Sequence, residues 1–211
     1  MFSYGNKNMD KQIEKMLYFT NQDLAKFMNP ISVNTFLERE TKKGNIIRLK
    51  RGIYTTKAKR TEIQIDREID PYLAYLTTNI LTSPSYLSLE WVLFAHNIII
   101  ENVYTMTAVT TKNRSKITNK LGRFERRNIN DDLFWGFEAK KVGDFVYYQA
   151  YPEKALLDHL RLKKDIAFEE SYFEELRLEI DRLNFKRLTQ FVRKFNKRKI
   201  DKCFTYLSKL R

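Results

Sequence analysis

Short polar and basic side chains recur between residues 31 and 56, in a pattern that could contact nucleic acid. Amide and hydroxyl groups can hydrogen bond to base edges, and lysine and arginine can neutralise phosphates. The candidate DNA contacts are Ser32, Asn34, Thr35, Arg39, Lys42, Lys43, Arg48, Lys50, Arg51 and Tyr54. They fall on two expected elements, a helix over 32–43 and a hairpin over 46–54. We expect the helix to enter the major groove, with the basic hairpin on the flanking phosphates or in the minor groove.

The spacing of the apolar residues predicts both elements. Val33, Phe36 and Leu37 lie three and four positions apart, as on one buried face of a helix that Ser32 or Pro30 would open. Gly44 is suited to the left-handed conformation in which helices often end. In the following run, IIRLKRGIY, apolar residues alternate with cations around a glycine turn, which is typical of a small hairpin with one buried face.

Two shorter helical patterns precede this stretch. The first covers residues 10–19. The second starts at Thr20, which has Asp23 three positions later, as in a capping box, and Asn29-Pro30 breaks it. This order of helices followed by a basic hairpin predicts a winged helix-turn-helix domain over residues 1–60. The alternative is an ordinary solvated helix followed by a surface hairpin.

The remaining residues, 61–211, alternate between helical and strand patterns. Asp70-Pro71 predicts a helix start, and the apolar run over 86–100 predicts a second buried helix. Strands are expected over 103–111, 122–129, 133–140 and 145–150. Pro152 starts another helix, and the pattern from Phe168 onward is helical. We therefore expect an α+β fold in which the winged helix is followed by a mixed α/β domain with a roughly four-stranded sheet and a helical tail.

Composition points to an anionic partner. The 211 residues carry 39 basic and 26 acidic side chains, a formal net charge of +13, which favours nucleic acid or an anionic membrane surface. The apolar helical faces of the basic segment 181–211 favour packing over a membrane role. We find no signal peptide pattern and no run long enough to span a membrane, and we expect a cytoplasmic protein.

A second chemistry is suggested by Glu138 and Lys140, which lie two residues apart in a predicted strand. Asp131 and Asp132 precede them. In many nucleases carboxylates hold a divalent ion, and a nearby lysine helps to orient the attacking water. Short Glu-x-Lys strings are common in so charged a chain, so we keep a metal-dependent nuclease with a winged-helix targeting module as the alternative function.

The other reactive side chains favour structural roles. Lys154 and Asp158 have the spacing of a helical ion pair, and Glu153 would complement the dipole of the first turn. His96 is expected at a helix end, and His159 and Cys203 are expected to be packing residues. With one cysteine and few glycines, we predict no zinc site, no nucleotide-dependent enzyme and no cofactor.

A second basic set lies within and between the predicted strands. Its members are Lys112, Arg114, Lys116, Lys120, Arg123, Arg126 and Arg127. The sequence leaves two interpretations open. The set could bind the phosphates of RNA or DNA, or it could be a solvated face of the sheet.

The chain resembles the AbiEi-type antitoxins of type IV toxin-antitoxin systems. The resemblance rests on IIRLKRGIYTT, SPSYLSLEWVLFAHNII, VYTMTAVTT and VYYQAYPEKALLDHLRL, in an order that runs from about residue 10 to 165. The Tyr-x-Ser-x-Glu and Pro-Glu-Lys-Ala-Leu-x-Asp elements begin here at Tyr86 and Pro152. Trp91 departs from the family pattern, which usually has a small residue after the glutamate.

This resemblance implies two roles and no enzymatic activity. The N-terminal winged helix would bind operator repeats in the promoter of its own operon and repress transcription. The second domain would neutralise a nucleotidyltransferase-like toxin without a stable complex. Dimer formation on DNA and a nucleic-acid-binding structural role without a toxin both stay open.

Overall fold

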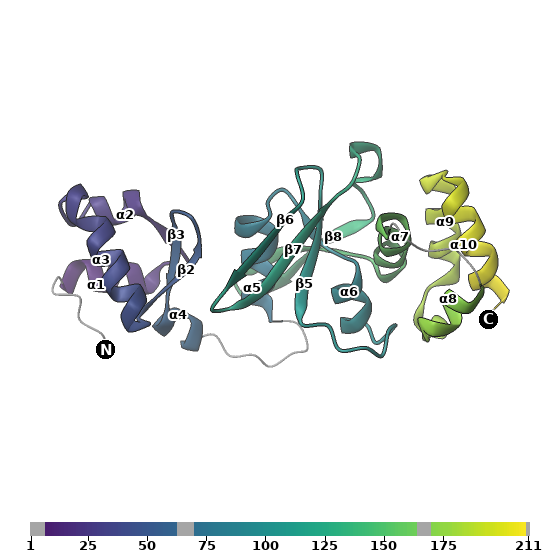
Figure 1. Cartoon of the computed structure of the whole chain (residues 1–211), viewed down its shortest axis with the longest axis horizontal. Helices are drawn as coiled ribbons and strands as arrows, with labels where there is room; N and C mark the ends of the chain where they lie inside the picture. The colour runs from purple at the N-terminus through teal and green to yellow at the C-terminus, as the bar shows by residue number, and fades with distance from the viewer. Residues whose placement is uncertain (1–6, 63–69, 164–169, 210–211) are drawn as a thin grey trace. The chain divides into compact units, whose positions relative to one another are not determined.

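The computed structural model describes residues 7–62, 70–163 and 170–209 (Figure 1). It has a mixed helical and stranded fold, so the predicted α+β class is confirmed. The described residues divide into two compact units. The first holds those up to residue 62 together with 117–122, and the second holds the rest. Of the predicted boundary region, 57–70, residues 63–69 lie outside the described ranges, as does Phe168.

Short helices and a small sheet build the first unit. Its elements are α1 (Lys7–Lys15), β1 (Phe19–Thr20), α2 (Asn21–Ala25), α3 (Pro30–Lys43), β2 (Ile46–Lys50), β3 (Ile53–Thr56) and α4 (Lys57–Glu62). The strands form an antiparallel three-stranded sheet in the order β1-β3-β2. Helix α1 ends at Lys15 rather than at the predicted Phe19, because Phe19 pairs with Tyr54 in this sheet.

Local side-chain chemistry sets the ends of α2 and α3. The Thr20 hydroxyl accepts a hydrogen bond from the Asp23 backbone N–H, and the Asp23 carboxylate accepts one from the Thr20 backbone N–H, as the capping box predicts. Asn29 caps α3, so this helix begins at Pro30, one of the two predicted starts. Gly44 ends it with φ of 78°.

One apolar core holds the first unit together. The α3 residues at helical spacing, Val33, Phe36 and Leu37, are buried together with side chains of α1, α2 and the sheet. These neighbours include Met9, Ile13, Phe19, Leu24, Ile46 and Tyr54. Because the buried residues occupy one face of α3, the polar residues between them lie on the opposite face.

A six-stranded sheet with the order β6-β7-β5-β4-β9-β8 forms the centre of the remaining structure. Its strands are β4 (Tyr86–Leu87), β5 (Thr105–Thr110), β6 (Ser115–Asn119), β7 (Gly122–Asn128), β8 (Phe137–Val142) and β9 (Phe145–Ala150). The predicted four-stranded sheet is therefore wrong in size. The missed strands are β4 and β6.

The two missed strands lack the signals of an ordinary strand. Strand β4 has two residues inside an apolar run with helical spacing, and it is held by long-range pairing. Leu87 pairs with Ala108 of β5 on one side and with Gln149 of β9 on the other. Within the predicted helix over 86–100, only α6 (Glu90–Ala95) is helical. Strand β6 is polar and mostly half-exposed, so its sequence shows little apolar alternation.

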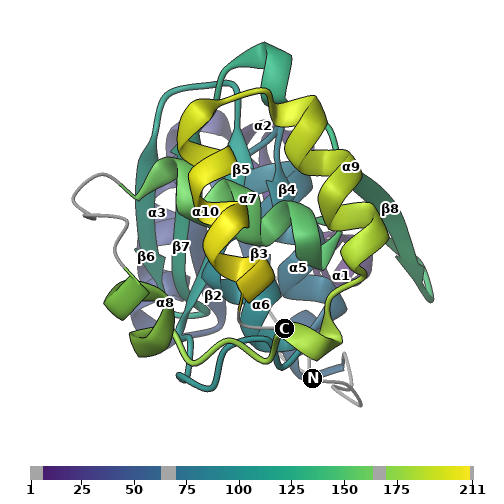
Figure 2. The ribbon, with the colours of Figure 1, turned by 90° about the vertical axis from the view of Figure 1, so that its right-hand side faces the viewer.

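Helices cover this sheet, whose strands belong to the second unit except for the residues of β6 and β7 within 117–122. They are α5 (Pro71–Tyr75) with its π-helical continuation (Leu76–Leu81), α6, α7 (Pro152–Leu162), α8 (Glu170–Glu175), α9 (Phe185–Phe195) and α10 (Arg198–Lys209), besides short 3-10 turns at Asp131–Leu133 and Ile180–Arg182. Helix α7 contacts α6 and β9, and α9 and α10 pack on α7 (Figure 2). In the described part of the chain, no helix has the length and apolar character needed to cross a membrane.

Candidate nucleic-acid interface

The outer face of α3 carries three of the predicted DNA contacts. Ser32, Asn34 and Thr35 are all exposed. The Asn34 side-chain oxygen accepts a hydrogen bond of 3.0 Å from the side-chain amide of Asn21, the first residue of α2. Helix α2 therefore holds one of these polar groups, while the buried stripe of α3 turns all of them outward.

The cations of α3 are already engaged within the helix. Lys42 lies 2.8 Å from Glu38, and both side chains are exposed. Arg39 and Lys43 lie 2.9 Å and 3.2 Å from one carboxylate oxygen of Glu40. Each of these predicted helix cations is thus matched by a carboxylate on the same helix, which weakens its attraction for phosphate.

Glu40 is a functional neighbour that the sequence interpretation missed. Its side chain is almost fully buried and also accepts a 2.9 Å hydrogen bond from Asn45, just beyond the helix end. Burial opposes its ionisation, but hydrogen bonds from Asn45, Arg39 and Lys43 outweigh this and lower its pKa. The spacing of Glu40 and Lys43 was a usable signal, because residues three apart share a helical face.

The hairpin places further cations beside α3. Arg48 and Arg51 are exposed, whereas Lys50 is half-buried. Gly52, with φ of 75°, provides the left-handed residue that the tight turn needs. The pairing register shifts between Arg48, which faces Tyr54, and Lys50, which faces Ile53. The local bulge at this shift bends the strand next to the turn.

A shallow groove of about 370 Å³ separates α3 from the hairpin. It is lined by Asn34, Leu37, Glu38, Thr41, Lys42, Arg48 and Tyr54.

The structure places Tyr54 differently from its predicted role as a DNA contact. It is only 8% exposed, and its ring stacks on Phe19 with a centroid distance of 6.0 Å, so it mainly supports the hairpin from the core.

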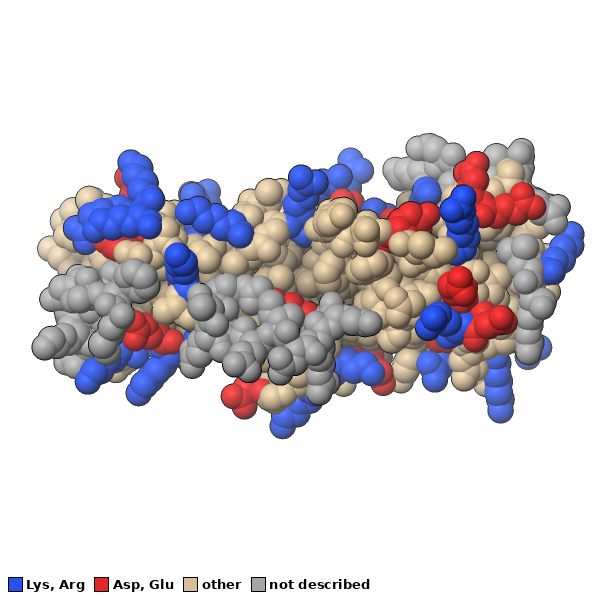
Figure 3. Space-filling view, turned by 90° about the horizontal axis from the view of Figure 1, so that it is seen from below, with Lys and Arg blue, Asp and Glu red and all other residues tan. Residues whose placement is uncertain are grey.

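The second basic set is brought together only in part. Arg114, Lys116, Arg126 and Arg127 line a cavity of about 850 Å³, which also includes Lys163 at the end of α7. Lys112 and Arg123 are exposed but do not line it. Figure 3 shows one face of the molecule, where lysine and arginine side chains are spread among fewer carboxylates.

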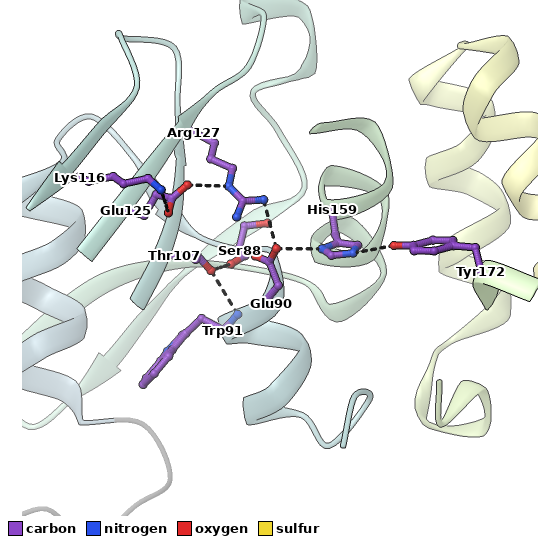
Figure 4. Close-up of polar contacts among 9 residues, drawn as sticks. All are labelled: Ser88, Glu90, Trp91, Thr107, Lys116, Glu125, Arg127, His159 and Tyr172. Carbon is purple, nitrogen blue, oxygen red and sulfur yellow. Dashed lines mark hydrogen bonds and ion pairs between the residues drawn. The ribbon is translucent and has the colours of Figure 1, made fainter. Parts of the chain in front are cut away.

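A chain of polar contacts runs from this cavity toward α8 (Figure 4). Glu125 lies 3.3 Å from Lys116 and accepts a 3.0 Å hydrogen bond from Arg127 Nε. Arg127 also lies 3.1 Å from Glu90, and Glu90 lies 3.3 Å from His159 Nδ1. The other ring nitrogen of His159 lies 3.1 Å from the Tyr172 hydroxyl. His159 is therefore part of a polar network, not the packing residue that we predicted.

Glu90 is held ionised by this network. Burial opposes ionisation, but the neighbouring His159 and Arg127 outweigh it and lower the pKa of Glu90 to about 2. Its position depends on Leu89, which has φ of 63° and ψ of −147° between β4 and α6. Such a conformation is costly for a residue other than glycine. It turns the chain sharply between Ser88 and Glu90, whose side chains have different partners.

The predicted pair Lys154–Asp158 forms, but inside the protein. Both side chains have no solvent exposure. The Asp158 carboxylate also accepts hydrogen bonds of 2.9 Å from the Tyr86 hydroxyl and from Ser88 Oγ, and Lys154 donates one of 2.9 Å to Tyr86. Burial lowers the pKa of Lys154 and raises that of Asp158. Because each group has a partner and neither reaches solvent, this cluster joins α7 to β4 and its following turn.

Glu153, at the start of α7, binds more than the helix end. It is buried and accepts a 2.7 Å hydrogen bond from the backbone N–H of Asn184, the residue that caps α9.

His96 ends α6 as predicted, and its ring lies 3.0 Å from the Gln149 side chain. Cys203 is buried in α10, and burial raises its pKa to about 11, so it fits the predicted packing role.

Glu138 and Lys140 of the nuclease alternative pair with each other, and Asp132 has a different partner. Glu138 forms an ion pair with Lys140 and accepts a 2.9 Å hydrogen bond from the Tyr151 hydroxyl. Asp132 lies 3.8 Å from Lys197. Within the described ranges, no group of three or more histidine, cysteine, aspartate or glutamate side chains is placed to hold a metal ion.

Comparison with protein-family models gives no match, and neither does comparison with curated proteins. The resemblance to AbiEi-type antitoxins therefore stays a prediction. The geometry of the two units supplies the argument for function.

Proposed function

We propose that this chain binds double-stranded DNA through its first unit, which acts as a winged helix-turn-helix. Helix α3 would lie in the major groove, and the β2–β3 hairpin would lie against the flanking backbone. The observation that carries the proposal is the exposed row Ser32, Asn34 and Thr35 beside the exposed cations Arg48 and Arg51. These are the two kinds of group that base reading and phosphate binding require.

The ion pairs of α3 indicate which of the proposed cations are available to bind phosphate. Arg39 and Lys43 share the buried Glu40, so turning them toward phosphate would leave that carboxylate short of partners. Arg48 and Arg51 have no ion pair in the described structure. We therefore assign the main phosphate contacts to the hairpin. Arg39 would stay near the helix surface, where its guanidinium lies 5.7 Å from the centre of the Phe36 ring.

We propose two biological roles for the chain, transcriptional repression through this DNA binding and antitoxin activity through the second unit. The resemblance to AbiEi-type antitoxins supports both. The operator would lie in the promoter of the chain's own operon, and the second unit would act against a nucleotidyltransferase-like toxin. The antitoxin role is tested by expressing the adjacent gene in cells with and without this chain and measuring growth. If this chain did not restore growth, the antitoxin role would be wrong.

DNA binding is tested by fluorescence anisotropy on the promoter fragment and on a scrambled duplex. We expect Arg51→Ala to weaken binding to both and to reduce the slope of log affinity against log salt by about one. Thr35→Ala should reduce discrimination between the two duplexes by about 1–3 kcal/mol if its hydroxyl contacts a base. Lys15→Ala, an exposed cation of α1, is the matched control. Equal effects of Arg51→Ala and Lys15→Ala would contradict the proposed interface.

A further inference from the structure

Strand β8 ends the six-stranded sheet and has one open side (Figure 2). It pairs with β9 along its whole length, from Phe137 opposite Ala150 to Val142 opposite Phe145. In the ranges that the structure describes, no other strand pairs with it. An edge of this kind presents unpaired backbone N–H and C=O groups and can accept a further strand.

Backbone contacts of β9 show which groups of β8 lie on the open side. The Val146 carbonyl and the Tyr148 N–H contact side chains of the π-helical segment Leu76–Leu81, at 2.9 Å and 3.5 Å, and therefore point away from β8. Opposite residues of an antiparallel pair either exchange both hydrogen bonds or neither. Lys141 faces Val146 and Ala139 faces Tyr148, so Lys141 and Ala139 direct their N–H and C=O groups to the open side.

The side chains that alternate with these residues carry opposite charges. Glu138 and Lys140 share the other face of β8 and form an ion pair. The second carboxylate oxygen of Glu138 accepts a 2.9 Å hydrogen bond from the Tyr151 hydroxyl, which fixes this side chain. A second β8 strand, antiparallel to the first about a two-fold axis at Ala139, would place Glu138 opposite Lys140 of the second copy. The reciprocal pair would form as well, and the side chains of such pairs, which exchange no backbone hydrogen bonds, come closest.

Of the axes through the four central residues of β8, only the one at Ala139 keeps like charges apart. A two-fold axis at Glu138, Lys140 or Lys141 would place that residue directly opposite its own copy, and like charges in that position are destabilising. With the axis at Ala139, Lys141 instead lies opposite Phe137 of the second copy. This register also suits the backbone, because Ala139 has its N–H and C=O groups on the open side and would exchange hydrogen bonds with its own copy.

Exposed apolar side chains beside this edge favour the same partner. Val146 and Tyr148 are each 39% exposed, and they lie on the face of the sheet that Ala139 and Lys141 share. A second copy would continue the sheet and bring its own Val146 and Tyr148 to this face.

We infer that the chain forms a homodimer through β8, with the two strands antiparallel about a two-fold axis at Ala139. The order of Glu138 and Lys140 selects a second copy as the partner, because one strand supplies both of the charges that the pairing needs. The inference concerns the second unit and does not rest on the proposed DNA binding by the first.

Sedimentation velocity of the full chain at several protein concentrations tests this dimer. We expect Lys140→Glu to weaken dimer formation about 10-fold or more, because it sets Glu138 opposite a second glutamate. Lys141→Glu is the matched control, since it changes the net charge equally but faces Phe137 of the second copy. It should leave dimer formation unchanged, or strengthen it slightly by lowering the net charge of +13. Net charge alone therefore predicts the opposite of the result expected for Lys140→Glu.

Mixing two variants separates pairing between copies from the ion pair within one strand. Glu138→Lys should also weaken its own dimer, since two lysines then face each other. In an equimolar mixture of Glu138→Lys and Lys140→Glu, each lysine of one chain lies opposite a glutamate of the other, so a heterodimer should form. Both chains lack the ion pair within the strand, so its loss cannot produce this recovery. The recovery would also show that both variants are folded.

Disulfide formation tests the position of the axis. Ala139→Cys should form a cross-linked dimer under mild oxidation, because opposite residues that exchange hydrogen bonds have Cα atoms about 5.5 Å apart. The two substituted positions of a Lys141→Cys dimer would lie roughly 14 Å apart and should not cross-link. The native Cys203 is buried and does not compete. A chain that stays monomeric at every concentration, no heterodimer in the mixture, or equal cross-linking of the two cysteine variants would overturn the inference.

Discussion

Among single residues, Gly136 leaves room for the buried side chain of Lys154, which is bound to Asp158 and Tyr86. It has φ of 76°, and a Cβ atom there would lie 2.9 Å from Cγ of Lys154. Lys154 cannot move away easily, because Asp158 and Tyr86 hold its ammonium group. We expect Gly136→Ala to lower the free energy of unfolding by about 2–4 kcal/mol, from backbone strain and the steric contact together, as measured by urea unfolding.

The matched control for this prediction is Gly143→Ala. Gly143 also has positive φ, 56°, but nothing lies within 4 Å of the added Cβ position. Its substitution should therefore cost only the backbone strain, about 1–2 kcal/mol. Equal losses in the two variants would mean that contact with Lys154 contributes nothing.

Glu90 should make stability depend on pH in the acid range. Its pKa is about 2 in the folded protein against 4.5 as the ordinary value. A lowered pKa means that the ionised form is favoured by folding, so its contribution is complete above about pH 4.5 and is lost as pH falls toward 2. Since each unit of pKa difference corresponds to about 1.4 kcal/mol, the lowered pKa of Glu90 contributes at most about 3 kcal/mol to the free energy of unfolding.

The measurement is the difference in unfolding free energy between the unchanged chain and Glu90→Gln across this range. The glutamine variant cannot titrate at this position, so the difference should shrink steadily from pH 5 to pH 2.5. A difference that stays constant over that interval would show that the charge of Glu90 is not what Arg127 and His159 stabilise.

At the scale of secondary-structure elements, the sequence predicts best what neighbouring residues decide. Thr20 with Asp23 and Gly44 predicted helix ends correctly, because a cap depends on side chains a few positions away. Strand β4 could not be predicted from the sequence, because Tyr86 and Leu87 are extended only through pairing with β5 and β9. The exposed face of α3 was predicted from its periodicity, whereas the burial of Tyr54 depends on the ring of Phe19, 35 positions earlier.

The candidate sites divide in the same way. The pair Lys154–Asp158 was predicted from its helical spacing, but its burial requires Tyr86 and Ser88 from a distant strand and turn. The contact between Glu90 and Arg127 joins α6 to β7 and has no signal in the sequence. Local spacing therefore identifies partners within a helix, and the tertiary fold decides whether the pair is solvated or enclosed.

Helix α3 offers a prediction about how its own carboxylate limits DNA affinity. Glu40→Gln would release Arg39 and Lys43 from their shared ion pair. If α3 lies in a DNA groove, binding to any duplex should become tighter, and the salt slope should steepen by about one for each additional phosphate that a released cation binds. Stability should fall at the same time, since Asn45 also loses its anionic acceptor.

Fluorescence anisotropy at several salt concentrations measures this change, and Glu14→Gln in α1 serves as a control for loss of one negative charge. The control should raise affinity only slightly through net charge. An unchanged salt slope in Glu40→Gln would indicate that Arg39 and Lys43 do not reach the backbone of DNA even when released.

At the scale of the whole molecule, the division into two compact units predicts that damage to one leaves the other intact. Lys154→Met leaves Asp158 as an uncompensated buried charge, which should destabilise the second unit by about 3–5 kcal/mol. The core of the first unit contains no member of this cluster. Amide hydrogen exchange should therefore accelerate in β4 and α7 and stay unchanged in α3, β2 and β3.

The double variant Lys154→Met with Asp158→Asn separates lost charge balance from lost packing. Asparagine keeps an oxygen that can accept hydrogen bonds from Tyr86 and Ser88, so protection in α7 should recover in part. DNA affinity, measured on the same samples, should equal that of the unchanged chain in both variants. If α3 lost protection in parallel with α7, the two units would unfold as one cooperative structure, and DNA binding would then depend on the stability of both.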